Sequence, residues 1–85
     1  MPKSVFTDAY ASLLRVLIGA RRGAHVTQVQ LAERLGRPQN FVSYYERGIR
    51  RVDVIEFYAV ARALGLDPVA LFAKVVRELP ERVEI

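Results

Sequence analysis

Four uncharged side chains are spaced as neighbours on one face of a short helix. They are Gln39, Asn40, Ser43 and Tyr44, which we call the polar stripe. Glutamine and asparagine can each form two hydrogen bonds with adenine, serine can bond to several bases, and an aromatic ring can contact a thymine methyl group. These residue types predict contacts with base edges in a DNA groove.

Arginine side chains lie at both ends of the polar stripe. Arg37 comes just before it, and Arg47, Arg50 and Arg51 follow it. Phosphates flank a helix that lies in the major groove. The four arginines are therefore predicted to contact phosphates.

The net charge of the chain is only +4, so its distribution is more informative than its size. Residues 1–36 carry five basic and two acidic groups, residues 37–52 four and one, and residues 53–85 four and six. Positive charge is thus concentrated around the polar stripe. Such a concentration is expected of a nucleic-acid binder, and a solvated arginine-rich surface is the alternative explanation.

Two short helices joined by a tight turn are predicted to present the polar stripe. Thr27 is a suitable N-cap, and the apolar residues after it recur at the spacing of one buried helix face. Gly36 can close this helix in the left-handed conformation, and Pro38 can begin the next one, where its missing N–H is not needed. The second helix is predicted to run from Pro38 to Arg47 and to end at Gly48.

The second helix is predicted to have a buried face opposite the polar stripe. Val42 and Tyr45 are three residues apart and can both point into the core. Tyr44 is adjacent to Tyr45, so its side chain points about 100° away on an α-helix. Tyr44 is therefore expected outside, where it either contacts DNA or is merely an exposed ring.

The sequences of these two helices resemble a known family. The first reads T-Q-x-x-L-A-x-x-L-G from Thr27, and the second reads P-Q-x-F-V-S-x-Y-E-x-G from Pro38. They are similar to the Cro and phage-repressor type of helix-turn-helix regulator, the xenobiotic-response-element (XRE) family, over residues 14–71. The resemblance implies an all-α, five-helix, lambda-repressor-like domain. It also implies a DNA-binding transcriptional regulator that usually binds a two-fold operator as a dimer.

The resemblance assigns roles to individual residues. It implies that Gln28 contacts phosphate and braces Gln39, while the polar stripe contacts bases. We place Thr27, at the same helix start, among the phosphate contacts. The family's arginine before the first helix of the motif falls on Arg21, and its partner carboxylate falls on Glu46. Such a pair would be a structural brace that ties the first helix to the third.

Two residues of the polar stripe depart from the family pattern. A serine is common where Asn40 stands, and a small or basic residue is common where Tyr44 stands. The relatives therefore do not supply the target sequence of this chain.

One further helix is predicted before this pair and another directly after it. The first helix is predicted from the N-cap Thr7 to Arg21, and residues 23–26 are expected to break it. The fourth helix is predicted from its cap Asp53 to Gly65. The apolar stripe of the fourth helix is expected in the core and consists of Val54, Phe57, Tyr58, Ala61 and Leu64.

The fifth helix is predicted to begin at Pro68, after the cap Asp67, and to stop before Pro80. It holds more apolar residues than a lid on a small domain needs, so residues 72–85 are predicted to form a dimerisation extension. A dimer would place two reading helices about 34 Å apart, on successive major-groove faces. The tail, residues 82–85, could pair as a strand across the two-fold axis. The predicted interface residues are Phe72, Val75, Val76, Leu79, Val83 and Ile85.

Length and composition limit the other possibilities. The 85 residues suit a single domain, with residues 1–6 as a flexible N-terminal arm. The chain has no cysteine, which excludes disulfides and thiolate metal sites, and no apolar run long enough to span a membrane. The only histidine, His25, has no neighbouring ligand set, and no enzyme signature, cofactor motif or small-molecule site is recognisable. A cytoplasmic protein is expected by default.

Two functional hypotheses of different classes follow. The first is a homodimeric regulator that binds double-stranded DNA sequence-specifically and represses by occupying an operator. The second is a protein-interaction module of the same fold, such as the DNA-binding antitoxin partner of a toxin or an adaptor to the transcription machinery. The second would lack a base-reading surface. Because Gln28 and the polar stripe are both present, the first hypothesis is preferred.

Overall fold

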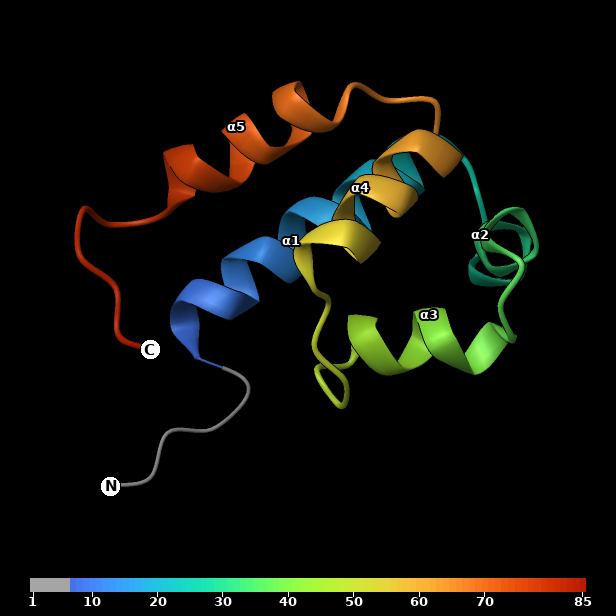
Figure 1. Ribbon diagram of the computed structural model, residues 1–85, viewed down its shortest axis with the longest axis horizontal. Helices are drawn as coiled ribbons and strands as arrows, with labels where there is room; N and C mark the ends of the chain where they lie inside the picture. Colours follow the sequence, from blue (N-terminus) through green and yellow to red (C-terminus); the bar gives the residue numbers. More distant parts are fainter. Residues whose placement is uncertain (1–6) are drawn as a thin grey trace.

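The computed structural model describes residues 7–85. This part of the chain contains five α-helices and no strand (Figure 1). In chain order they are α1 (Asp8–Gly23), α2 (Gln28–Leu35), α3 (Gln39–Glu46), α4 (Val54–Ala63) and α5 (Pro68–Glu78). The predicted all-α, five-helix fold is confirmed. The predicted N-terminal arm, residues 1–6, lies outside the described residues.

Side chains cap the start of four helices at the predicted positions. Each accepts a hydrogen bond from a backbone N–H of the first turn, which would otherwise have no partner. Gln30 and Glu56 add the reciprocal bond of a capping box, and each accepts an N–H at 2.9 Å. The capping residues are Thr7, Thr27, Asp53 and Asp67.

The turn between α2 and α3 closes much as predicted. Gly36 has a φ of 68°, the left-handed conformation expected at the end of α2. Pro38 is the N-cap of α3 rather than its first residue, because its ψ of 154° is extended. Helix α3 is thus one residue shorter at each end than predicted, and Gly48 follows it with a φ of 76°.

Helix α1 continues two residues beyond the predicted end, to Gly23. His25 follows with a φ of 58°, and this left-handed residue turns the chain toward α2. The side chain of His25 is exposed, whereas Val26 is buried beneath the start of α2. The break between the two helices therefore lies in residues 24–26.

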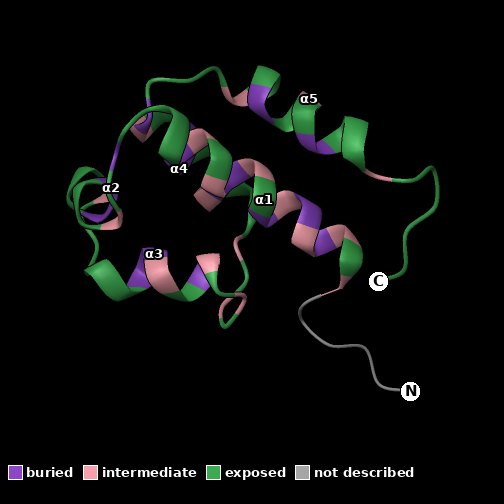
Figure 2. Ribbon diagram, turned by 180° about the vertical axis from the view of Figure 1, so that it is seen from behind, coloured by how far each residue is buried: buried purple, intermediate pink, exposed green. Residues whose placement is uncertain are grey.

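The core lies where the five helices meet. Helix α2 packs against α3 and α4, α1 packs against α3 and α5, and α4 also contacts α5. Figure 2 shows that each helix has buried residues on one side and exposed residues on another. Helices α3 and α5 lie on opposite sides of α1 and α4 (Figure 1). The largest fully buried side chains are Tyr45, Leu17, Leu31, Val42, Val60 and Val75.

Helix α4 turns a different face to the core than predicted. Part of its predicted stripe is buried, but Val54 and Tyr58 are 81% and 53% exposed, and Val60 is buried in their place. Helix α4 carries apolar residues on several faces, so periodicity does not decide which face is covered. The contacts with α2 and α5 decide it, and the placement of Val54 and Tyr58 in the core was wrong.

The predicted dimer residues divide into buried and exposed ones. Val75 is only 2% exposed in the core of the single chain, so its assignment to a dimer interface was wrong. Leu79 is half-buried and packs against the same core. The tail, residues 82–85, is not a strand in the single chain. The residues that remain exposed are Phe72, Val76, Val83 and Ile85.

Candidate nucleic-acid interface

Helix α3 lies at the edge of the molecule (Figure 1), and the polar stripe is on its more exposed face. Gln39, Asn40 and Tyr44 are exposed, and Ser43 is half-buried. All four side chains are therefore accessible to a ligand that approaches α3. The opposite face of the helix is buried and consists of Phe41, Val42 and Tyr45.

A buried ion pair holds the end of α3 against α1. Arg21 donates to Glu46 twice, from Nε to Oε2 at 2.7 Å and from Nη2 to Oε1 at 3.0 Å. Its Nη1 donates to the carbonyl of Val26 at 2.9 Å. The side chains of Arg21 and Glu46 are only 10% and 5% exposed. Removal of either one would leave the other charge buried without a partner, which strongly destabilises a fold. The hydrogen bond to Glu46 raises the pKa of Arg21 above its usual value.

Two glutamines connect this ion pair to the polar stripe. Gln28 Nε2 donates to Glu46 Oε1 at 2.9 Å, and Gln39 Nε2 donates to Gln28 Oε1 at 3.0 Å. A chain of hydrogen bonds thus runs from the core to the first residue of the polar stripe. Gln39 still has its carbonyl oxygen and one N–H for a ligand.

Phe41 is a buried residue of α3 that the sequence analysis missed. The Cζ atoms of Arg37 and Arg50 lie 5.0 and 4.7 Å from the centre of its ring, within cation–π range. The ring also meets Tyr45 edge-on, with 5.8 Å between the ring centres. Phe41, Val42 and Tyr45 have the i, i+1, i+4 spacing of a buried helix face, and this was the signal that could have identified Phe41.

Arg50 also forms a bidentate ion pair with Glu56, at 2.6 Å from Nη2 to Oε2 and 3.1 Å from Nη1 to Oε1. The hydrogen bond from Arg50 lowers the pKa of the Glu56 carboxyl, and the same bond raises the pKa of Arg50. Both terminal nitrogens of the guanidinium are thus engaged within the chain. The D-x-x-E spacing from Asp53 was the sequence signal for Glu56, because it is typical of a capping box.

Arg47 and Arg51 lie over aromatic rings. The Cζ atom of Arg51 is 4.4 Å from the ring centre of Tyr10, and that of Arg47 is 5.6 Å from the ring centre of Tyr44. The hydroxyl of Tyr10 accepts the N–H of Val52 at 2.8 Å, so α1 also anchors the loop after α3. Neither arginine has a carboxylate partner within residues 7–85, which leaves its charge available to an anion.

The other predicted phosphate contacts lie at the starts of α2 and α3. Thr27 is exposed, and its hydroxyl accepts the N–H of Gln30 at 3.0 Å. Arg37 is exposed in the turn before α3. Because Gln28 is bonded to Gln39, these two helix starts lie side by side. Thr27, Gln28 and Arg37 are therefore at the end of α3 where the polar stripe begins.

Tyr45 takes part in this region only through its ring. Its side chain is fully buried, and burial raises its pKa well above the ordinary range, so the hydroxyl stays neutral. The hydroxyl has no hydrogen-bond partner in the described part of the chain. A buried hydroxyl without a partner lowers the stability of the fold. Any stabilisation by Tyr45 must therefore come from the packing of its ring.

Residues 7–85 contain neither a cluster of metal-ligating side chains nor a membrane-spanning helix. No three histidine, aspartate or glutamate side chains there lie close enough together to hold a metal ion. None of the helices in this range is long and apolar enough to cross a membrane.

The chain belongs to the helix-turn-helix family and is of the XRE type. The helix-turn-helix family model matches residues 19–71, which is more than half of the chain. The chain is also 38% identical over 63 residues to an uncharacterized HTH-type transcriptional regulator of Sinorhizobium fredii, over 68% of this chain and 82% of that protein. It is therefore a helix-turn-helix transcriptional regulator, a class that binds DNA.

Solved structures of similar proteins have the same fold. An XRE-family like protein from Pseudomonas syringae pv. tomato is 50% identical, with a TM-score of 0.79 over 85% of this chain and 88% of that one. A mutant restriction-modification controller protein has a TM-score of 0.76 at 21% identity, over 85% and 91% of the two chains. The clp gene regulator ClgR from C. glutamicum has a TM-score of 0.74 at 22% identity, over 91% and 100%. At such low identity the last two support the fold alone.

Proposed function

We propose that this protein binds a two-fold DNA operator as a homodimer and represses transcription by occupying it. The polar stripe carries the proposal, because it is an exposed, uncharged face whose first residue is held by hydrogen bonds to a buried ion pair. A side chain that is already held in place loses little conformational freedom when it binds. Repression by occupancy needs no contact other than the one with DNA.

In this proposal α3 lies in the major groove with the polar stripe against the base edges. Gln39 offers its free carbonyl oxygen and one N–H, the pair of groups that adenine matches. Asn40 offers the same pair, Ser43 bonds through its hydroxyl, and the ring of Tyr44 contacts a thymine methyl group. This set of side chains favours A·T pairs in the half-site.

Arginine and other polar groups at the two ends of the polar stripe bind the flanking phosphates. Arg50 has a lesser part, because Glu56 already engages both of its terminal nitrogens. We assign to Arg50 the role of holding the loop after α3 against α4. The residues proposed to bind phosphate are Thr27, Gln28, Arg37, Arg47 and Arg51.

The dimer interface is assigned to an apolar surface that overlaps the predicted one only at Phe72. Val54, Tyr58, Val69 and Phe72 line a shallow depression of about 390 Å³ between α4 and α5. We call these four residues the apolar patch, and all four are exposed. Exposed apolar patches commonly mark protein interfaces, and a second copy would cover this one. Phe72 belongs to both assignments.

Selection of bound duplexes from a random pool tests this function. We expect an enriched inverted repeat whose half-sites are about one helical turn apart, bound by two copies of the chain. Enrichment of a single half-site without a repeat would contradict the homodimer. Failure to enrich any sequence would contradict specific DNA recognition and favour the protein-interaction module of the same fold.

A further inference from the structure

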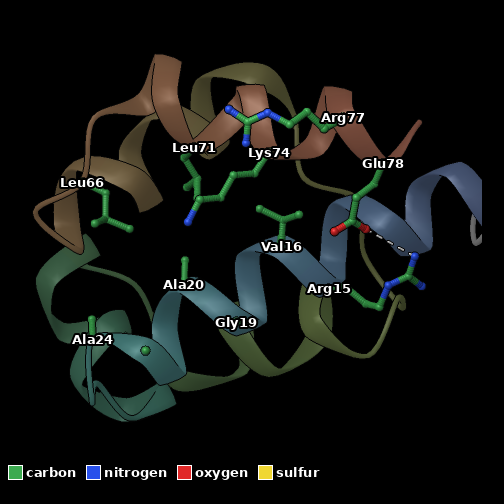
Figure 3. A pocket seen from close by; sticks show the side chains of 11 residues that line it. Arg15, Val16, Gly19, Ala20, Ala24, Leu66, Leu71, Lys74, Arg77 and Glu78 are labelled. Atoms are coloured by element: carbon green, nitrogen blue, oxygen red, sulfur yellow. Dashed lines mark ion pairs between the residues drawn. The ribbon is translucent and has the colours of Figure 1, made fainter. Parts of the chain in front are cut away.

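A groove of about 610 Å³ lies between α1 and α5 (Figure 3). None of its lining residues belongs to the polar stripe, the phosphate contacts or the apolar patch. It opens between α1 and α5, whereas α3 lies on the opposite side of α1 (Figure 1). The apolar part of its lining consists of Val16, Ala20, Ala24, Leu66 and Leu71.

From Gly19 to Ala24, the side of the groove formed by α1 and the residue after it has almost no side-chain bulk. Gly19, Ala20, Gly23 and Ala24 all line it, at the spacing of one helix face. A Cβ atom added at Gly19 or Gly23 would meet no other atom within 4 Å. Glycine inside a helix lowers stability relative to alanine, and no described atom packs closely enough to Gly19 to require it. Such a bare face permits the close approach of a second helix.

The rim of the groove is positively charged. Lys74 and Arg77 extend along it from α5, and Arg15 lies at its end (Figure 3). Arg15 has a partner in Glu78, at 3.6 Å, but Lys74 and Arg77 have no carboxylate partner within residues 7–85. Charge around an interface selects partners of the opposite sign.

We propose that this groove binds an acidic amphipathic α-helix of another protein. Its apolar face would lie on the bare surface around Gly19, and its carboxylates would meet Lys74 and Arg77. Residues 15–24, which line one side of the groove, span about 14 Å, which suits a helix laid along it. Because the groove shares no residue with the proposed DNA contacts, the helix binds while DNA is bound.

Three synthetic peptides of equal length test the proposal on the full chain. The first is a helix with alanine and leucine on one face and glutamate along both edges, the second has lysine at every glutamate, and the third is a scrambled version of the first. Fluorescence anisotropy measures binding, and amide chemical shifts in NMR spectra locate it. We expect the acidic helix to bind at least about tenfold more tightly than the other two, with shifts centred on residues 19–24.

Variants of the groove separate this binding from general charge attraction. Lys74→Glu with Arg77→Glu should make the basic helix the tighter binder by about tenfold, whereas Arg82→Glu, outside the groove, should leave the preference unchanged. Gly19→Leu should abolish binding by filling the groove, and Gly19→Ala, which adds one methyl group in open space, should retain it.

Three results would overturn the proposal. They are equal binding of the acidic and basic helices, amide shifts at the polar stripe or the apolar patch instead of residues 19–24, and saturable binding of dodecanoate in the groove without binding of any peptide.

Discussion

The outer face of α3 and the outer faces of α4 and α5 are both exposed, but they are supported differently. On α3 the exposed side chains are polar, and Gln39 is linked through Gln28 to an ion pair whose side chains are 10% and 5% exposed. In the apolar patch on α4 and α5 the exposed side chains are apolar, as at Val54 and Val69, which are 81% and 78% exposed. Directional hydrogen bonding needs side chains that are held in place, whereas apolar contact needs only area and shape. The comparison therefore favours DNA recognition on α3 and protein contact on α4 and α5.

Removal of the buried carboxylate tests the support beneath α3 and should have the largest effect. Glu46→Ala leaves Arg21 buried without its partner, so we expect the free energy of unfolding to fall by about 3 kcal/mol. Urea denaturation followed by circular dichroism measures this loss. The control is Glu56→Ala, whose ion pair is partly in water and should contribute about 1 kcal/mol or less. Equal losses in the two variants would show that burial of the first pair has no special importance.

Substitutions on α3 and in the loop after it should affect DNA binding in different ways. Gln39→Ala or Asn40→Ala should cost about 1 to 3 kcal/mol on the selected site and weaken discrimination between sequences. Arg51→Ala should weaken binding to all duplexes alike and reduce the salt slope by about one unit, and Arg50→Ala should reduce it less. Titrations of selected and scrambled duplexes at several salt concentrations measure both quantities. The division into base and phosphate contacts fails if Gln39→Ala and Arg51→Ala give the same pattern.

A pair of matched substitutions tests the apolar faces. Val54→Asp places a charge in the apolar patch and should weaken the dimer by about tenfold or more. It should not impair folding, because Val54 is exposed in the first turn of α4, where an acidic residue is favourable. Val76→Asp, on the exposed surface outside the patch, should leave the dimer intact. Light scattering distinguishes these results. Dissociation of the dimer by Val76→Asp alone would show that the interface lies in the region predicted from the sequence.

Acid should weaken the contact between α4 and the loop after α3. This is the smallest effect among the four predictions. Arg50 lowers the pKa of Glu56 in the folded chain below the ordinary value of 4.5 that the unfolded chain keeps. The stabilisation from this carboxylate is therefore complete above about pH 4.5 and is lost as the pH falls through the lower, folded pKa. Melting temperatures measured from neutral pH downward should fall less steeply for Glu56→Gln than for the natural chain. Parallel curves would mean that the ion pair contributes nothing to stability.

The helices around the polar stripe were predictable because their signals are local. Thr27 and Gly36 mark the two ends of α2 by capping chemistry, which depends on residues within one turn. The outward direction of Tyr44 follows from the inward direction of its neighbour Tyr45, because adjacent residues on a helix point in different directions.

The choice of the buried face was less predictable. Val54 and Val75 both sit in strongly apolar helices, yet the first is 81% exposed and the second 2%. A helix that is apolar on several sides can bury any of them, and only its neighbours select one. The burial of Phe41 was predictable from its spacing with Val42 and Tyr45, but its contacts with two arginines were not, because only the fold brings them over its ring.

Residue pattern alone was enough to place the helices, their caps and the uncharged outer face of α3, because each of these depends on contacts within a few residues along the chain. Helix packing decided the rest. The bond from Gln39 to Gln28, the covered side of α4 and the groove beside Gly19 all depend on how separate helices approach one another. That approach reflects the fit of many side chains at once, and no short segment contains it.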